Sequence, residues 1–328
     1  MISNPLVSIN CITFNHEKYI ALALEGFLMQ KTNFPFEIII HDDASTDNTV
    51  NIIKSYADKY PDLFVTIFQD INQYSQGVKP CFENVMPKCR GKYVAHCEGD
   101  DYWTDPYKLQ KQIDFLEANP EYVFTFHDSE ILDQNTGVKR LRIGNRKIDE
   151  IVDLESVINQ NNISTASIVH RNILQRDTMP EWLFKVSKGD YGLVVLLAEK
   201  GLGRLLSGVM SGYRVHDGGV WSGTNPAYRN MEDIKFFNCL NEYFPQSKVK
   251  VVIKKRLSYC FMDKAFIKIR NGEFISGLFI YLKHINAVSD KKMRKELKKI
   301  LSAIKSGILS LVRKMYSFFQ FKHKSPVV

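Results

Sequence analysis

The stretch Glu98-Gly99-Asp100-Asp101 places two adjacent aspartates just after a short apolar run, Tyr93–Cys97. The run predicts a buried strand, and Thr104-Asp105-Pro106 predicts the start of a helix behind the acidic residues. Adjacent carboxylates in a partly buried turn repel each other, so a cation should compensate them. Oxygen ligands of this kind favour Mg²⁺ or Mn²⁺. The alternative is a solvated acidic turn that simply precedes a helix.

Two other apolar runs also end in groups that could bind a ligand. Leu6–Thr13 is followed by Phe14, and Phe36–His41 is followed by Asp42-Asp43. Ligands of open α/β sheets bind at the carboxyl ends of strands, where these groups should meet the acidic stretch. The alternative role for the two aspartates is to cap the following helix. The loop after the first run has no glycine, which disfavours a dinucleotide-binding loop or a P-loop.

The order of the elements predicts an α/β fold with a mostly parallel sheet, covered by helices on both faces and followed by a basic helical C-terminal region. The expected strands are Leu6–Thr13, Phe36–His41, Leu63–Phe68, Tyr93–Cys97, Tyr122–His127, Ile163–His170 and Arg204–Val215. Helices are expected from Asn15, after a cap at Ser45 or Thr46, at Tyr107–Ala118 and at Tyr191–Ala198. A polar, basic and mobile loop is expected at 134–150.

Composition indicates a soluble globular protein and excludes several other classes. The six cysteines form no CxxC pair, which disfavours a zinc site and suggests reduced thiols in a cytoplasmic protein. The N-terminus does not read as a signal peptide, and no stretch approaches the roughly 20 apolar residues of a spanning helix. Length allows one large domain or two.

The positive charge of the chain lies in its C-terminal part. Residues 251–328 contain 18 Lys or Arg and 4 Asp or Glu, whereas the rest of the chain contains 26 and 32. Within this part, apolar residues recur at three- and four-residue steps, namely Met293, Leu297, Ile300, Leu301, Ile304, Ile308, Leu311, Val312, Met315 and Phe319. A basic amphipathic helix of this kind can lie on an anionic membrane. Packing on the protein is the alternative, and no nucleic-acid-binding module accompanies the charge.

Three motifs in order resemble the family 2 glycosyltransferases of GT-A fold. They are Val7-Ser8-Ile9 with Thr13-Phe14-Asn15, then Ile40–Thr49 (IHDDASTDNT), then Glu98-Gly99-Asp100-Asp101. The resemblance covers roughly residues 1–220. It implies a nucleotide-sugar donor whose diphosphate is held through Mn²⁺ or Mg²⁺.

The resemblance assigns roles to residues at the strand ends. It implies that Thr13 and Phe14 contact the nucleobase and that Asp43 accepts from a base N–H. It makes Asp101 the direct metal ligand and places Asp100 nearer the ribose. The family more often has Tyr at the position of Phe14, and Asp at that of Glu98.

Other assignments come from the second half of the resemblance. Asp190 matches an acidic residue at a helix start that takes the proton of an acceptor hydroxyl, and a helix N-terminus favours its ionised form. An ordinary helix N-cap is the alternative, and Gly189 replaces a second acidic residue. Arg214 is implied as a phosphate contact and His216 as a further metal ligand; the alternative for His216 is an ordinary loop histidine.

Weaker expectations concern the donor sugar and a closing loop. Asp128 and Arg171 are expected near the donor sugar or the acceptor. Gly218-Gly219 and Trp221 suggest a flexible loop that could close over the donor.

The expected activity is metal-dependent, inverting sugar transfer from a nucleotide sugar, UDP-linked, to a glycan or lipid-linked acceptor at the cytoplasmic membrane face, without nucleic acid as a partner. The donor would bind residues 1–105 and the acceptor residues 106–225, with residues 226–328 as the helical basic region. The alternatives are a sugar-nucleotide nucleotidyltransferase, which would need a glycine-rich basic first loop, and a catalytically silent nucleotide- or glycan-binding protein.

Overall fold

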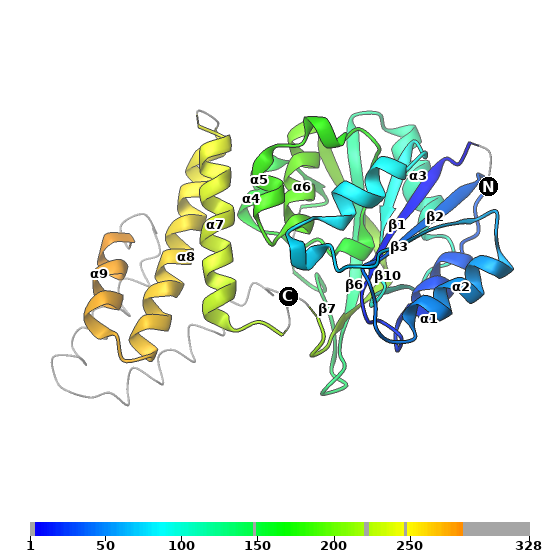
Figure 1. Ribbon diagram of the computed structural model, residues 1–328. Helices are drawn as coiled ribbons and strands as arrows, with labels where there is room; N and C mark the ends of the chain where they lie inside the picture. Colours follow the sequence, from blue (N-terminus) through cyan, green and yellow to red (C-terminus); the bar gives the residue numbers. More distant parts are fainter. Residues whose placement is uncertain (1–3, 147–148, 220–222, 246–247, 285–328) are drawn as a thin grey trace. The chain divides into compact units, whose positions relative to one another are not determined.

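The computed structural model of the protein describes residues 4–146, 149–219, 223–245 and 248–284 (Figure 1). The chain divides into two compact units. The first consists of residues 1–157 and 161–217, and the second of residues 158–160 and the chain from 218 onward.

The first unit is built on one large mixed sheet with the strand order β3-β2-β1-β4-β9-β6-β10-β5. Strands β1 to β4 form a parallel half, β6 and β10 form a second parallel pair, and β9 is antiparallel to its neighbours on both sides. The strands are β1 (Val7–Thr13), β2 (Phe36–Asp42), β3 (Phe64–Phe68), β4 (Tyr93–His96), β5 (Tyr102–Trp103), β6 (Tyr122–Asp133), β7 (Lys139–Leu141), β8 (Ile151–Val152), β9 (Val169–Arg171) and β10 (Leu202–Val215).

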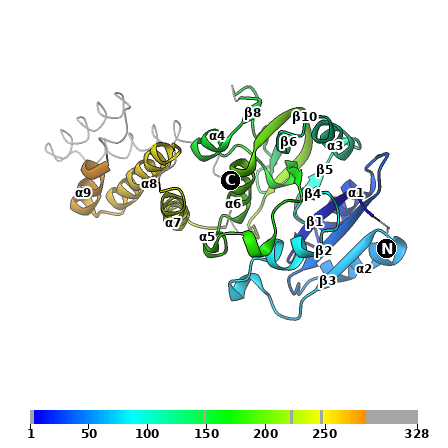
Figure 2. The same ribbon diagram turned by 90° about the horizontal axis from the view of Figure 1, so that it is seen from above.

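Helices connect and cover these strands, as Figure 2 shows from above. Those of the first unit, with α4 running into the second, are α1 (Ile20–Leu28), α2 (Thr49–Lys59), α3 (Lys108–Ala118), α4 (Leu154–Asn159), α5 (Glu181–Lys185) and α6 (Gly189–Lys200). A single π-helical turn, Cys81–Val85, lies between β3 and β4.

Side-chain alternation along β1 decides which helices cover each face. Val7, Ile9 and Cys11 are fully buried in one core cluster with apolar residues of α1, α2 and α3. Residues between them point to the opposite face, because successive strand side chains alternate. There Asn10 donates a hydrogen bond from Nδ2 to Cys81 Sγ at 3.3 Å, joining β1 to the π-helical turn.

The parallel register brings the ends of the first strands to one edge. Thr13 at the end of β1 pairs with Asp42 at the end of β2. Past the end of β4, the Gly99 N–H donates to the Ile12 carbonyl at 2.9 Å, so the acidic stretch lies beside the end of β1. The expected meeting of these groups at one sheet edge is confirmed.

Several predicted boundaries are wrong. Ser45 and Thr46 do not cap α2, which begins at Thr49. The segment predicted as a strand at Ile163–His170 contains a 3₁₀ turn at Thr165–Ser167, and strand pairing begins only at Val169. The loop predicted at 134–150 includes strand β7. The basic side chains and turn residues of that loop do not predict a strand. β7 forms because its backbone pairs with β6 in the folded sheet.

Among its described residues, the second unit has the helices α7 (Pro226–Tyr243), α8 (Lys250–Arg270) and α9 (Phe274–His284). Asn225 caps α7 by accepting from the Tyr228 N–H at 2.8 Å, and Pro226 occupies its first position. Met262, Ala265 and Tyr281 form the core between α8 and α9. The amphipathic helix predicted from Met293 to Phe319 lies outside the described residues.

Candidate active site

Asp100 lies between two histidines at the carboxyl edge of the sheet. His216, just after β10, has Nε2 at 3.1 Å from Asp100 Oδ2, and His16, in the loop after β1, has Nε2 at 3.7 Å from the same oxygen. Nitrogen and carboxylate atoms of the three residues all lie within 4.8 Å of one another. Residues from positions 16, 100 and 216 thus form one potential metal-binding group.

Asp101 is not part of this group. Its Oδ1 accepts the Arg214 backbone N–H at 2.9 Å, and its Oδ2 is buried without a hydrogen-bond partner among the described residues. Its side chain is almost fully enclosed, with 1% exposure. The role of direct metal ligand predicted for Asp101 stays a prediction, and the structure brings Asp100 rather than Asp101 to His216.

Arg214 closes the acidic stretch from the side of β10. One guanidinium nitrogen, Nη1, donates to the Asp100 carbonyl oxygen. The guanidinium lies over the rings of Tyr102 and Tyr19, at 4.3 and 5.2 Å from their centroids. Arg214 therefore braces the turn that carries both aspartates, and its predicted phosphate contact stays a prediction.

Charge is poorly balanced within the acidic stretch. Burial, followed by the charges of Asp100 and Asp190, raises the pKa of Glu98 to about 8. Burial and the charges of Asp100 and Glu98 raise the pKa of Asp101 well above its usual value. Burial alone would raise the pKa of Asp100 too, but the hydrogen bond from His216 and the charge of His16 lower it. Asp100 is therefore the carboxylate best prepared to stay ionised.

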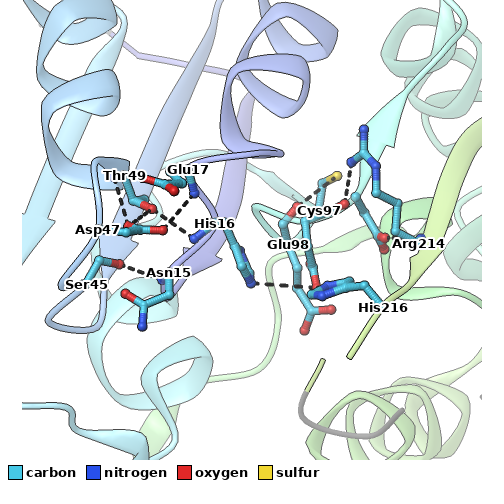
Figure 3. A network of polar contacts seen from close by, with 12 residues as sticks. Asn15, His16, Glu17, Ser45, Asp47, Thr49, Cys97, Glu98, Arg214 and His216 are labelled. Carbon is cyan, nitrogen blue, oxygen red and sulfur yellow. Dashed lines mark hydrogen bonds and ion pairs between the residues drawn. The ribbon is translucent and has the colours of Figure 1, made fainter. Parts of the chain in front are cut away.

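The loops after β1 and β2 are joined by a set of hydrogen bonds (Figure 3). The Asn15 N–H donates to Ser45 Oγ, and Asn15 Oδ1 accepts from the Thr46 N–H, both at 2.8 Å. Asn15 adopts φ +54° and Ala44 φ +64°, a left-handed conformation that asparagine tolerates better than alanine. Strain in both loops indicates that their shape is imposed by the contacts between them.

The predicted nucleobase residues lie at these same loops. Thr13 is buried and its Oγ1 has no hydrogen-bond partner among the described residues, whereas Phe14 is 41% exposed. Asp43 is 4% exposed, and its two carboxylate oxygens accept the Gln73 and Tyr74 backbone N–H groups at 2.7 and 2.9 Å. A carboxylate oxygen can accept a second bond, so a base contact by Asp43 stays a prediction.

Asp42 has a local structural role. Its carboxylate accepts from the Ser45 N–H at 2.9 Å and from Ser45 Oγ at 2.5 Å. The capping alternative thus applies to the turn at residues 42–45 rather than to the start of α2.

Asp190 lies in the first turn of α6, exposed to solvent. Lys188 occupies the N-cap position, so Asp190 is not the ordinary N-cap that was its alternative. Its charge contributes to the raised pKa of Glu98 and to the raised pKa of Cys81. The role of proton acceptor that the resemblance implies for Asp190 stays a prediction.

Two of the weaker expectations have structural explanations. Asp128 accepts the Ile143 and Gly144 N–H groups, each at 2.8 Å, and holds that loop. Arg171 donates to the Tyr122 carbonyl at 2.8 Å and to the Leu116 carbonyl at 2.6 Å. Neither residue is brought to the acidic stretch by the contacts that the structure describes.

The proposed closing loop is only partly within the described residues. Gly218 and Gly219 belong to the second unit, and Trp221 lies outside the described residues. The loop's closure over a donor therefore has no structural account.

A cavity of about 460 Å³ lies away from this cluster, beside the starts of β1 and β4 and the end of β9. Its basic side chains are engaged within the protein, Arg90 with Glu37 and Lys92 with Glu117. The chemistry-bearing groups lie at the other edge of the sheet, so this cavity is not the candidate site.

Sequence reasoning missed His16 and Tyr19. The sequence pattern predicts that the helix begins at Asn15, so both residues would lie in its first turns. In the structure α1 begins only at Ile20, and both residues belong to the loop before it. The Tyr19 ring lies 4.7 Å from that of His216. A histidine three residues beyond the end of a parallel strand was the available signal, since that position lies at the ligand-binding edge.

The donor set suits a divalent cation. Imidazole nitrogen and carboxylate oxygen are ligands that Mn²⁺ accepts, and Mg²⁺ prefers the oxygen. Asp100 and His216 approach each other at the separation expected of two atoms bound at right angles to one ion, about 3 Å for ligand distances near 2.1 Å. These residues therefore fit the metal that the resemblance implies.

All six cysteines are free, as expected of reduced thiols. Among the helices that the structure describes, none is both long and apolar enough to cross a membrane.

Comparison with known proteins agrees with the sequence motifs. The sequence profile of "Glycosyl transferase family 2" matches residues 8–177, more than half of the chain. An uncharacterized protein of Mycobacterium tuberculosis is 39% identical over 215 residues, which are 66% of this chain and 60% of that protein. The Escherichia coli UDP-Glc:alpha-D-GlcNAc-diphosphoundecaprenol beta-1,3-glucosyltransferase WfaP is 29% identical over 217 residues, 66% of this chain and 79% of WfaP.

Solved structures match the fold at low sequence identity. Staphylococcus aureus TarS 1–349 in complex with UDP has a TM-score of 0.58 at 16% identity, covering 97% of this chain and 92% of that chain. The mannosyltransferase PcManGT from Pyrobaculum calidifontis, in complex with GDP-Man and Mn²⁺, has a TM-score of 0.55 at 15% identity, covering 95% and 84%. The expected GT-A fold, with helices following it, is confirmed. By its motifs, its fold and the profile match, this chain belongs to glycosyl transferase family 2.

Proposed function

We propose that this protein is a metal-dependent, inverting glycosyltransferase that moves a sugar from a UDP-linked donor to a glycan or lipid-linked acceptor in cell-surface polysaccharide synthesis. One observation carries the proposal. Asp100 pairs with His216 at the carboxyl edge of the sheet, and the charges of Asp100 and Asp190 both raise the pKa of the buried Glu98. A metal-binding pair can neutralise the charge of a leaving diphosphate, and a carboxylate on a different element can remove the acceptor proton.

The donor would bind along the first three loops of residues 1–105. Phe14 offers an exposed ring beside the base, and Thr13 and Asp43 offer polar atoms for its edge. Arg214 would contact the diphosphate. We assign a uridine nucleotide for two reasons. TarS, which is similar in fold, is solved with UDP, and WfaP, which is similar in sequence, is named for UDP-Glc.

Asp100 and His216 would hold a Mn²⁺ or Mg²⁺ ion, in place of the hydrogen bond between them. When bound, the ion supplies positive charge that stabilises the departing nucleoside diphosphate. Asp101 would support this arrangement through the Arg214 backbone, or ligate the ion itself as the family motif implies.

Asp190 acts on the acceptor. Its carboxylate takes the proton of the acceptor hydroxyl while that oxygen forms a bond to the anomeric carbon. The bond from this carbon to the phosphate oxygen breaks, and its electron pair leaves with the diphosphate. Attack from the face opposite the leaving group inverts the anomeric centre, without a covalent enzyme intermediate. Residues 106–225 would supply the acceptor side.

Calorimetry with UDP, GDP and dTDP, each with and without Mn²⁺, tests this proposal on the full chain. We expect UDP to bind at least tenfold more tightly in the presence of Mn²⁺, because a cation held by Asp100 and His216 would offset the negative charge of the diphosphate. Absence of metal-dependent binding for every nucleotide would contradict the proposal and favour a catalytically silent scaffold. Tight binding of GDP instead would replace only the assigned nucleotide.

Membrane contact through residues 251–328 would bring the enzyme to a lipid-linked acceptor, the class for which WfaP is named. In the described part of this region, one face of α9 is exposed. Ile275 is 87% and Phe279 71% accessible, while Tyr281 on the other face packs on α8. Lipid headgroups with negative charge would meet the basic side chains of the same region.

Flotation with vesicles of phosphatidylethanolamine and phosphatidylglycerol checks this contact. Phe279→Asp should lower the membrane partition coefficient about tenfold or more, since burying such a ring in the interface is worth about 1.5–3 kcal/mol. Ile71→Asp, at an exposed position of the first unit, should leave it unchanged. Equal binding of the two variants to the vesicles would show that α9 does not contact the membrane.

A further inference from the structure

We propose that His16, in the loop after β1, is a third protein ligand of the divalent cation held by Asp100 and His216. The inference rests on the proposed metal-dependent function and adds a residue to it. A ligand from this loop would tie the cation to the segment that also carries Thr13 and Phe14.

The distances favour direct ligation. His16 Nε2 is 3.7 Å from Asp100 Oδ2, and the donor atoms of all three residues lie within 4.8 Å of one another. Two atoms bound to one ion at about 2.1 Å cannot be more than about 4.2 Å apart, so small side-chain rotations suffice. The His16 and His216 rings are 6.2 Å apart and nearly perpendicular, at 84°. Figure 3 shows His16 reaching from the first loop toward His216, which comes from the end of β10.

The backbone at His16 is held before any ion binds. Its N–H donates to Thr49 Oγ1 at 2.8 Å, and the next N–H, of Glu17, donates to Asp47 Oδ2 at 3.1 Å. Glu17 Oε2 in turn accepts the Asn48 N–H at 3.0 Å. Together with the bonds from Asn15 to the second loop, these contacts fix the backbone from which the imidazole projects. Metal binding would therefore cost little conformational entropy in this loop.

The second ring nitrogen of His16 and the hydroxyl of Thr13 border the same space beside Gly99. His16 Nδ1 is buried without a hydrogen-bond partner among the described residues, and so is Thr13 Oγ1. Both atoms lie within 3.0 Å of the point that a Cβ on Gly99 would occupy, Nδ1 at 3.0 Å and Oγ1 at 2.7 Å. A ligating histidine usually donates its other N–H to an oxygen. Glycine at position 99 leaves the space in which the Thr13 hydroxyl can accept it.

Electron paramagnetic resonance of Mn²⁺ tests the inference without turnover. The full chain is titrated with Mn²⁺ alone and with Mn²⁺ plus UDP, and the free ion is counted from its signal. Electron spin echo modulation then counts the imidazole nitrogens bound to the ion. We expect two histidines in the wild type, one in His16→Gln, and a loss of Mn²⁺ affinity of about 10–100-fold in this variant. His284→Gln, on α9, is the matched control and should match the wild type.

The outcomes separate this inference from the function on which it rests. If Mn²⁺ binds wild type and His16→Gln equally, with the same nitrogen count, His16 is not a ligand and the proposed function stands. If Mn²⁺ binds neither protein, with or without UDP, the metal-dependent function and the His16 role fall together. Loss of one imidazole signal with unchanged circular dichroism would establish the ligand.

Discussion

Replacing Asp190 with asparagine should lower kcat by about 10²–10⁴-fold and leave the affinity for UDP and Mn²⁺ unchanged. The amide keeps the size of the side chain but cannot take the acceptor proton, and general-base catalysis contributes about this much to a rate. Asp190 is exposed in the first turn of α6, and Lys188 rather than Asp190 occupies the N-cap position, so the fold should tolerate the change. Single-turnover sugar transfer, with nucleotide binding by calorimetry, measures both quantities.

Glu181→Gln, at the exposed start of α5, is a matched control that should keep full activity. Wild-type kcat in Asp190→Asn would refute the base assignment. A parallel loss of UDP binding would instead show that Asp190 shapes the donor site. If both the wild type and Asp190→Asn bind the donor but transfer no sugar, the protein is a catalytically silent binding protein.

Asp100→Asn should abolish most metal-dependent nucleotide binding. Asp100 is the carboxylate between His16 and His216, and its depressed pKa keeps it ionised and able to ligate a cation. Removing its charge should weaken Mn²⁺ by about 100-fold or more, because an ion of this kind depends on charged oxygen ligands. UDP should then bind with the weak affinity that wild type shows without metal.

Asp101→Asn distinguishes the two aspartates. Asparagine at 101 can still accept the Arg214 N–H through its Oδ1 and would replace a carboxyl whose pKa burial and two neighbouring charges already raise. If Asp100 is the ligand, this variant should keep Mn²⁺ affinity within a few-fold of wild type. A larger loss in Asp101→Asn than in Asp100→Asn would restore Asp101 as the direct ligand, as the family motif implies.

Local patterns were sufficient for the parallel half of the sheet. The apolar runs before Phe14, Asp42 and Glu98 are β1, β2 and β4, with ends within a residue of those expected. Strands buried on both faces leave little choice, because an uninterrupted apolar run of this length must be covered on each side. The arrival of polar strand ends at one edge then follows from parallel pairing alone.

Elements whose formation depends on distant partners were missed. β5 has two residues and exists because Trp103 and Tyr102 pair with Ser211 and Gly212 of β10. The segment before β9 reads as a strand, yet its backbone turns at Thr165–Ser167, and Ser167 instead bonds to the Ser164 carbonyl. Such choices are decided by tertiary contacts, which override the propensity of short segments.

Motifs and apolar runs along the chain were enough to predict the family, the fold and the sheet edge that carries the candidate site. Folding then selected which groups meet at that edge. It paired Asp100 with His216 across 116 residues, turned Asp101 to the backbone of Arg214, and brought in His16, whose place in the chain suggests only a helix start. The physical reason is that side-chain direction depends on the loop conformation, here on the left-handed Asn15 and its bonds to the second loop, which no local pattern specifies.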